Sequence, residues 1–240
     1  MSVTICIPTY NRKRFEKLIE YNIDCQSYFN IQEIIILDDS DKDDPLCIRT
    51  LYPIRYIRVP RCSIGMKRNM LVSICNTKYV AFMDTDDFYN PDYISHSIFE
   101  METNKKTIAG SADMIMYKDN QYYKQKCVFL HMLNEGTMVF QKSAWQRFAD
   151  TNTNEAVPFL LNNIPNIIET NIDRVMCCLA HDNNTINKTP WLKDQYKYHL
   201  QLIYNVTSST NSTSLTCYGK SNSTWTLYWG GRKIYGARIW

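Results

Sequence analysis

Short apolar runs alternate with helically spaced segments through the first hundred residues of this 240-residue chain. The expected strands are residues 3–7, 33–37, 55–59 and 79–83. The expected helices start near Arg12, with Thr9 or Asn11 as N-cap, run over 64–75, and start again after Asn90, with Pro91 in the first position. Such alternation requires crossover connections, and therefore predicts a mostly parallel sheet flanked by helices.

The second half of the chain is less regular. Residues 112–117 and 122–130 flank a polar turn and predict a β-hairpin, and residues 136–140 predict a further strand. We expect a helix from Lys142 or Ser143 and another over 172–180. From about Thr207 the chain becomes rich in Ser, Thr and Asn and then aromatic, and the pattern there assigns no element.

Composition excludes several classes of protein. The net charge is +3, which is too small an excess for a protein that binds nucleic acid by neutralising phosphates. The nine cysteines form no C-x-x-C pair and have no zinc-site spacing. The apolar runs are all far shorter than the roughly 20 residues of a membrane-spanning helix, and the N-terminus lacks the pattern of a signal peptide. We therefore expect a soluble, cytoplasmic protein in a reducing compartment.

The most polar short segments fall where the expected strands end. They are residues 9–12, Asp38 with Asp39, and residues 84–87. In open parallel sheets the ligand binds outside the carboxyl ends of the strands, so this topology brings the three segments together. The sequence predicts a binding site at that edge.

Two acidic groups suggest different roles at this edge. Asp84 and Asp86 are two residues apart after a buried strand, which suits a hard divalent cation with oxygen ligands. The alternative is an acidic cluster at a helix N-terminus. Asp38 and Asp39 suit acceptance of the N–H of a pyrimidine base, and a solvated acidic turn is the alternative.

The segment from Ser63 to Asn69 opens a helix with Gly65 and two cations, Lys67 and Arg68. Backbone N–H groups and these side chains together favour an anion such as a diphosphate. An exposed basic helix face is the alternative.

Four motifs in one order resemble family 2 glycosyltransferases of the GT-A fold. They are Ile7-Pro8-Thr9-Tyr10-Asn11-Arg12, Ile35-Ile36-Leu37-Asp38-Asp39-Ser40, Gly65-Met66-Lys67-Arg68-Asn69 and Phe82-Met83-Asp84-Thr85-Asp86-Asp87. The resemblance covers about the first 100 residues and implies a Rossmann-like central sheet with a smaller acceptor-side β region. The Asn-, Lys-, Ile- and Tyr-rich composition also resembles glycosyltransferases of large DNA viruses.

The resemblance implies a role for each matching residue. Those implied to bind the nucleotide-sugar are Pro8, Thr9, Tyr10, Arg12, Asp38, Asp39, Lys67, Arg68, Asp84 and Thr85. Within this set, Thr9 and Asp39 would bind the base, usually uracil, and Arg68 the base or the diphosphate. The implied ligands of Mn²⁺ or Mg²⁺ are Asp84, Asp86 and His181, while a polar surface or capping role is the alternative for His181.

The family normally carries a catalytic base in a Glu-Asp pair before a helix, and this pair is missing here. Asp173 fits the position best, and Glu169 is the second candidate. For both, the alternative is an acidic residue in the first turn of a helix.

We therefore expect an inverting, metal-dependent transfer of a sugar from a UDP-sugar to a hydroxyl of a glycan or glycoprotein. Residues 1–103 would bind the nucleotide-sugar, residues 104–206 would bind the acceptor and supply the base, and 207–240 form a tail. A sugar-nucleotide nucleotidyltransferase is an alternative, although the first strand is followed by no glycine-rich loop. An inactive relative that binds carbohydrate or a partner protein is another.

Overall fold

The computed structural model describes residues 1–126, 131–182, 184, 188–193, 197–198, 215–218, 224–229 and 232–238. The chain divides into two compact units, Met1–Tyr198 and His199–Trp240, which are described separately. Among the described residues, no helix is both long and apolar enough to cross a membrane.

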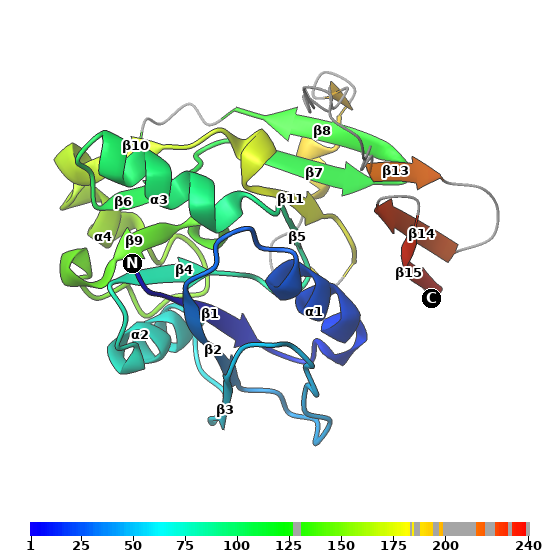
Figure 1. Ribbon diagram of the computed structural model, residues 1–240, viewed down its shortest axis with the longest axis horizontal. Coiled ribbons are helices and arrows are strands. Elements are labelled where there is room, and N and C mark those ends of the chain that lie inside the picture. Colours follow the sequence, from blue (N-terminus) through cyan, green and yellow to red (C-terminus); the bar gives the residue numbers. More distant parts are fainter. Residues whose placement is uncertain are drawn as a thin grey trace. The chain divides into compact units, whose positions relative to one another are not determined.

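A seven-stranded sheet organises the first unit, in the order β10-β6-β9-β4-β1-β2-β3 (Figure 1). Its strands are β1 (Val3–Thr9), β2 (Ile31–Asp38), β3 (Ile54–Arg58), β4 (Tyr79–Phe82), β6 (Ile108–Gly110), β9 (Val139–Gln141) and β10 (Ile167–Glu169). Neighbours are parallel except at β9, which pairs antiparallel with β4 and with β6. The expected mostly parallel sheet is confirmed, with its first four strands close to their expected bounds.

Helices cover this sheet, and both of its faces are buried around β1 and β2. The helices are α1 (Glu16–Asp24), α2 (Ile64–Ile74), α3 (Tyr93–Thr103) and α4 (Val157–Leu161), and Figure 1 shows α2 beside β1 and β2. Cys6, Ile35 and Leu37 pack with Leu71 and Val72 of α2. The residues between them in each strand point to the opposite face and are equally buried. Each fully buried large apolar side chain contributes ~1.5–3 kcal/mol.

Two expected helix starts are wrong because local turns intervene. Asn11 has a positive φ of 52°, so it cannot adopt the extended backbone of an N-cap, and the chain makes a 3-10 turn, Lys13–Phe15, before α1. The side chain of Asn90 accepts a hydrogen bond from the N–H of Asp92 at 2.9 Å. This local turn contains Pro91, and α3 begins only at Tyr93.

A second, five-stranded sheet has the order β12-β8-β7-β11-β5. Its strands are β5 (Phe88–Tyr89), β7 (Met114–Lys118), β8 (Gln121–Gln125), β11 (Met176–Leu179) and β12 (Lys197–Tyr198). β7 and β8 form the expected hairpin, although residues 127–130 lie outside the described residues. Its turn is made by Asp119 and Asn120, both with positive φ, as a two-residue hairpin turn requires.

Two further predicted helices, one from Lys142 or Ser143 and one over residues 172–180, do not form at those residues. Residues 172–180 form a 3-10 turn, Ile172–Arg174, followed by β11, which pairs with β7 and β5. A short apolar run fits a strand or a helix equally well, and the available sheet edge decided the outcome. At Lys142–Ala144 there is a single 3-10 turn, because Trp145 is already extended. The remaining 3-10 turns are Glu135–Thr137, Ile164–Asn166 and Thr189–Trp191.

The second unit contains a three-stranded antiparallel sheet in the order β13-β14-β15. Its strands are β13 (Leu215–Tyr218), β14 (Thr224–Trp229) and β15 (Arg232–Arg238). The expected boundary between residues 206 and 207 lies outside the described residues.

Candidate active site

The polar segments after β1, β2 and β4 meet at one edge of the sheet, because these strands are neighbours in the order β4-β1-β2. The N–H of Asp39 donates to the carbonyl of Thr9 at 3.4 Å. Nη2 of Arg12 lies 3.1 Å from Oδ2 of Asp86. The convergence expected from strand order is therefore seen as direct contacts between segments that are distant in sequence.

Asp39 is buried and lies at the centre of an ionic group, the Asp39 cluster, which it forms with the buried Lys67 and the exposed Arg61. Nζ of Lys67 donates to Oδ1 at 2.6 Å, and Nη1 of Arg61 donates to Oδ2 at 2.5 Å. The backbone N–H of Cys62 also donates to Oδ2, at 3.1 Å. Burial alone raises the pKa of Asp39, but these hydrogen bonds outweigh burial and hold the pKa below its ordinary value. Asp39 is therefore an ionised carboxylate with two cations.

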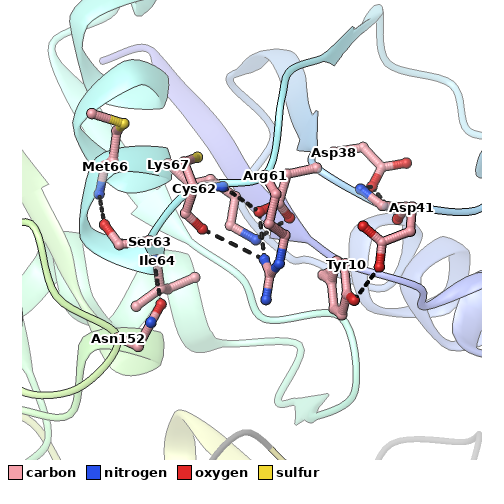
Figure 2. A network of polar contacts seen from close by, with 12 residues as sticks. Tyr10, Asp38, Asp41, Arg61, Cys62, Ser63, Ile64, Met66, Lys67 and Asn152 are labelled. Atoms are coloured by element: carbon pink, nitrogen blue, oxygen red, sulfur yellow. Dashed lines mark hydrogen bonds and ion pairs between the residues drawn. The ribbon is translucent and has the colours of Figure 1, made fainter.

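Tyr10 and Arg61 lie side by side (Figure 2), and Arg61 also contacts Asp39. The guanidinium carbon of Arg61 lies 3.7 Å from the centroid of the Tyr10 ring, within the range of a cation–π contact. The Tyr10 hydroxyl donates to Asp41 at 2.5 Å. Oγ1 of Thr9 is buried beside this group and has no hydrogen-bond partner among the described residues.

Several of the residues expected to bind nucleotide instead support the loops. Asp38 is buried and accepts hydrogen bonds from the backbone and hydroxyl of Ser40 and from the hydroxyl of Tyr56. Pro8 is buried within β1, and Thr85 is buried in the turn after β4. Their assigned roles in donor binding stay predictions.

The start of α2 is not available as a backbone anion site. Ser63 is the N-cap, and its hydroxyl accepts from the N–H of Met66 at 3.0 Å. The N–H of Ile64 donates to the side chain of Asn152 at 3.1 Å (Figure 2). The N–H of Gly65 donates to the carbonyl of Thr151 at 3.0 Å. The protein itself satisfies these groups, so the expectation that they would cradle a diphosphate is wrong. The side chains of α2 remain as donors.

Arg68 is the centre of a second buried ionic group, the Arg68 cluster, which includes Asp84, Glu155 and Glu135. Nε of Arg68 donates to Oε1 of Glu155 at 2.9 Å, and Nη2 donates to Oδ1 of Asp84 at 3.1 Å. Burial by itself lowers the pKa of Arg68, but the nearby carboxylates outweigh it and raise the pKa above its ordinary value. The guanidinium is therefore permanently charged and its position is fixed.

Glu135 adds a third carboxyl group to this single cation. Burial, followed by the charge of Glu155, raises its pKa to about 7. The next residue, Gly136, lies against Asp84, since a Cβ added there would be 2.6 Å from Oδ2 of Asp84. The hydroxyl of Tyr89 donates to the carbonyl of Gly136 at 2.9 Å and accepts from the N–H of Asp84 at 2.7 Å. The segment that carries Glu135 is thus fixed beside the strand end that carries Asp84.

Asp86 is surrounded by basic side chains. Its Oδ2 lies 3.1 Å from Nη2 of Arg12 and 3.0 Å from Nε2 of His181. Burial alone raises the pKa of Asp86, but the hydrogen bond with His181 and the charge of Arg12 bring it below its ordinary value. Nη2 of Arg14 lies 3.0 Å from Nδ1 of His181. Nδ2 of Asn184 lies 3.1 Å from the same Nε2, so Asp86 and this amide both contact one ring nitrogen of His181.

The donor set fits a hard divalent cation in part. Asp84 and Asp86 supply carboxylate oxygens, and Mg²⁺ commonly takes one or two carboxylates together with substrate phosphates. The described residues contain no group of three or more His, Cys, Asp or Glu side chains arranged for a metal. His181 is the third expected ligand, and its Nε2 lies 3.0 Å from Oδ2 of Asp86.

Asp87 connects the acidic turn to the second sheet. Its Oδ1 accepts from the N–H of Leu179 in β11 at 3.1 Å. Burial, followed by the charges of Asp86 and Asp84, raises the pKa of Asp87 to about 8. A neutral Asp87 therefore acts as a structural link between the turn and β11.

The two carboxylates expected as catalytic base lie on different elements. Asp173 lies in the 3-10 turn before β11, where its Oδ2 accepts from Nζ of Lys124 at 2.8 Å. Glu169 ends the edge strand β10 and accepts from the N–H of His131 at 2.7 Å. The catalytic roles of Asp173 and Glu169 stay predictions.

Sequence reasoning missed Glu135, Glu155 and Arg61. Glu155 directly precedes the apolar run 156–161 with Pro158 near its start, so it is an acidic residue just before a helix. The expected motif is a Glu-Asp pair before a helix, and Ala156 follows Glu155, so the pattern did not single this residue out. Glu135 and Arg61 lie in loops, and the sequence offers no signal for either.

Comparison with known proteins matches this chain to glycosyltransferases. A family model described as Glycosyl transferase family 2 matches residues 4–162. The UDP-Glc:alpha-D-GlcNAc-diphosphoundecaprenol beta-1,3-glucosyltransferase WfaP of Escherichia coli is 33% identical over 137 residues, covering 52% of this chain and 47% of that protein. Glycosyltransferase GlyA of Streptococcus pneumoniae is 27% identical over 138 residues, covering 55% and 19%. This chain thus spans about half or less of the length of these relatives.

Solved structures show the same fold. The crystal structure of Staphylococcus aureus TarS 1–349 matches with a TM-score of 0.59 at 14% identity, covering 75% of this chain and 60% of that one. The structure of the same protein in complex with UDP-GlcNAc matches with a TM-score of 0.58 at 13% identity, covering 77% and 60%.

Proposed function

The chain belongs to glycosyl transferase family 2, and we propose that it transfers a sugar from a UDP-sugar to a hydroxyl group of a glycan or glycoprotein. The observation that carries this proposal is the meeting of the Asp39 cluster, the Arg68 cluster and Asp86 at the carboxyl edge of one sheet. A nucleotide-sugar has a base, a diphosphate and a sugar to be bound, and the two clusters and Asp86 place polar and charged side chains for such contacts next to one another. The match of the composition to glycosyltransferases of large DNA viruses stays a prediction.

The Asp39 cluster suits the base of the donor. The Tyr10 ring offers a stacking face, Arg61 and Lys67 offer hydrogen-bond donors, and the unpartnered hydroxyl of Thr9 offers one more polar contact. UDP is favoured by the relatives, since the E. coli protein is named for UDP-Glc and TarS has been crystallised with UDP and with UDP-GlcNAc.

Asp86 and Asp84 would hold Mn²⁺ or Mg²⁺, with His181 as a third ligand. When bound, the cation would offset the negative charge that develops on the departing nucleoside diphosphate. Arg12 lies 3.1 Å from Asp86, so this side chain also brings positive charge to the same place.

We propose a single displacement with inversion, in which a carboxylate takes the proton of the acceptor hydroxyl. The sequence favours Asp173 and then Glu169 for this role. The geometry adds Glu135, whose pKa of about 7 suits a general base at neutral pH and whose neighbour Gly136 lies against Asp84. Asp173→Asn, Glu169→Gln and Glu135→Gln separate these candidates. The variant that removes the base should lower kcat by about 10²–10⁴-fold and retain UDP binding.

The test of the function is hydrolysis of a panel of UDP-, GDP- and dTDP-sugars with Mn²⁺, Mg²⁺ or EDTA. We expect release of UDP from a UDP-sugar, dependent on the cation and lost in Asp86→Asn. Asp43→Asn is the matched control, because Asp43 is an exposed aspartate paired with Arg58. Absence of turnover together with absence of any nucleotide-induced thermal shift would favour an inactive binding protein instead.

A further inference from the structure

Arg68 is a buried cation with one N–H₂ group left uncommitted. Its Nε is taken by Glu155, its Nη2 is taken by Asp84, and its guanidinium carbon lies 4.5 Å from the centroid of the Phe82 ring. Nη1 is buried and has no hydrogen-bond partner among the described residues. Buried N–H groups are rarely left unpaired, so Nη1 is the position where a ligand can supply the missing hydrogen-bond acceptor.

Glu155 reaches Arg68 from a segment that is hydrogen-bonded to α2, the helix that carries Arg68. We call residues 148–156 the strap. At one end of the strap, the N–H of Phe148 donates to Oδ1 of Asn69 at 2.8 Å, and Nδ2 of Asn69 donates to the carbonyl of Phe148 at 2.9 Å. Further along, the N–H of Gly65 donates to the carbonyl of Thr151 at 3.0 Å, and the N–H of Ile64 donates to Oδ1 of Asn152 at 3.1 Å. The hydroxyl of the N-cap Ser63 donates to Asp150. The fit is close, because a Cβ added at Gly65 would lie 1.8 Å from the carbonyl oxygen of Ala149. The strap therefore fixes Glu155 relative to the helix that carries Arg68.

We propose that Glu155 is a positioning residue for the donor, and that it acts by fixing the guanidinium of Arg68 beside Asp84 so that Nη1 receives an anionic oxygen of the nucleotide-sugar. The inference rests on the proposed function and adds the residue that prepares this contact. Glu155 is a carboxylate whose Oε1 accepts from Nε of Arg68, so it acts through Arg68 and does not bind the anionic donor directly.

Burial explains why this task needs Glu155. The Asp84 side chain is 29% exposed, whereas those of Glu155 and Arg68 are 5% and 4% exposed. An arginine held by Asp84 alone would be free to turn with that half-exposed carboxylate. A second carboxylate on Nε, inside the protein, restricts the guanidinium to one orientation.

The experiment measures the dissociation constant of UDP by calorimetry, and KM and kcat for the UDP-sugar that the wild-type protein hydrolyses. Glu155→Gln keeps an acceptor for Nε but removes the charge. Glu33→Gln is the matched control, because it makes the same change in another glutamate–arginine pair, that of Glu33 with Arg55. Circular dichroism and Tm establish that each variant is folded.

We expect Glu155→Gln to weaken UDP binding and raise KM by about fivefold or more, with kcat at saturating donor within about threefold of wild type. Glu33→Gln should leave UDP affinity within about twofold. Unchanged UDP affinity in Glu155→Gln, whatever its Tm, would make the residue merely structural and overturn the proposal.

A loss of kcat by about 100-fold with KM unchanged would also overturn it, since Glu155 would then act in the chemistry itself. If Glu155→Gln does not fold, Glu155→Asp keeps the charge on a shorter arm, and an unchanged KM in that variant has the same meaning. A wild-type protein that neither binds UDP nor hydrolyses any UDP-sugar removes the proposed function, and this inference with it.

Discussion

The Asp39 cluster and the Arg68 cluster both lie at the same edge of the sheet, yet their charges are balanced in opposite ways. Asp39 is one carboxylate with two cations, whereas Arg68 is one cation among three carboxyl groups. In the first cluster the carboxylate pKa falls, and in the second the pKa of Glu135 rises to about 7. The comparison teaches that the first cluster is prepared for a partner rich in acceptors. In the second, a proton on Glu135 relieves the acid excess, and Nη1 of Arg68 stays as a donor for a ligand.

The largest effect should come from removing the single cation of the Arg68 cluster. Arg68→Met leaves Glu155 buried without its partner, and breaking a buried ion pair costs about 3–5 kcal/mol. We expect the free energy of unfolding, measured by urea denaturation, to fall by that amount. The double variant Arg68→Met with Glu155→Leu should recover part of the loss, because no uncompensated charge remains on Glu155. If the double variant is less stable than Arg68→Met alone, the unpaired charge of Glu155 is not what destabilises Arg68→Met.

The pH dependence of stability should have opposite signs in the two clusters. The pKa of Glu135 is about 7 in the folded protein and near 4.5 when unfolded, so the folded state holds more protons between these values. The contribution of Glu135 is therefore complete below pH 4.5 and is lost as the pH rises to about 7. Glu135→Gln should remove this loss, an effect on the order of 3 kcal/mol at pH 7.

Asp39 provides the contrast to Glu135. Its pKa is lowered in the folded protein, so its contribution is present above its ordinary value of 3.8 and is lost as the pH falls through the folded value. Urea denaturation of wild type, Glu135→Gln and Asp39→Asn across pH 3–8 measures both effects. Identical slopes in wild type and Glu135→Gln between pH 4.5 and 7 would remove the distinction between the clusters.

A smaller effect is expected from disturbing the strap that holds Glu155 in place. Gly65→Ala places a methyl group 1.8 Å from the backbone oxygen of Ala149, and the backbone cannot yield without moving the strap. Overpacking of this kind costs about 1–3 kcal/mol. We expect Tm to fall and KM for the donor to rise, while Asp39 and its partners are unaffected. Gly110→Ala, where the nearest atom is 3.0 Å away in a side chain, is the matched control.

The smallest effect on stability should come from Arg61, the exposed cation of the Asp39 cluster. Its side chain is 52% exposed, so its ion pair with Asp39 contributes only about 0–1 kcal/mol. Arg61→Met keeps most of the side-chain length but removes the charge and the donors that face the base. We expect Tm to change little and UDP affinity to fall by about tenfold or less. Tighter UDP binding in this variant would show that Arg61 covers the base site in the free protein.

Sequence patterns predicted the frame of the site because they depend on local periodicity. β1, β2, β3 and β4 are apolar runs of the length of a buried strand, and parallel topology places their polar ends together. Asp39, Arg68 and Asp86 could therefore be named in advance as residues of one edge. The same reasoning failed for β11, since a short apolar run is equally compatible with a helix, and pairing with β7 made it a strand.

What only the tertiary structure decided is which charges are partners. Glu155 lies 87 residues from Arg68, and the strap that carries it takes up the N–H groups of α2 that were expected to bind a diphosphate. Periodicity acts over a few residues, whereas an ion pair forms only where the whole fold brings two side chains within about 4 Å of each other. The sequence by itself therefore determined the sheet and the edge that holds the site. The fold determined how the charges at that edge are balanced.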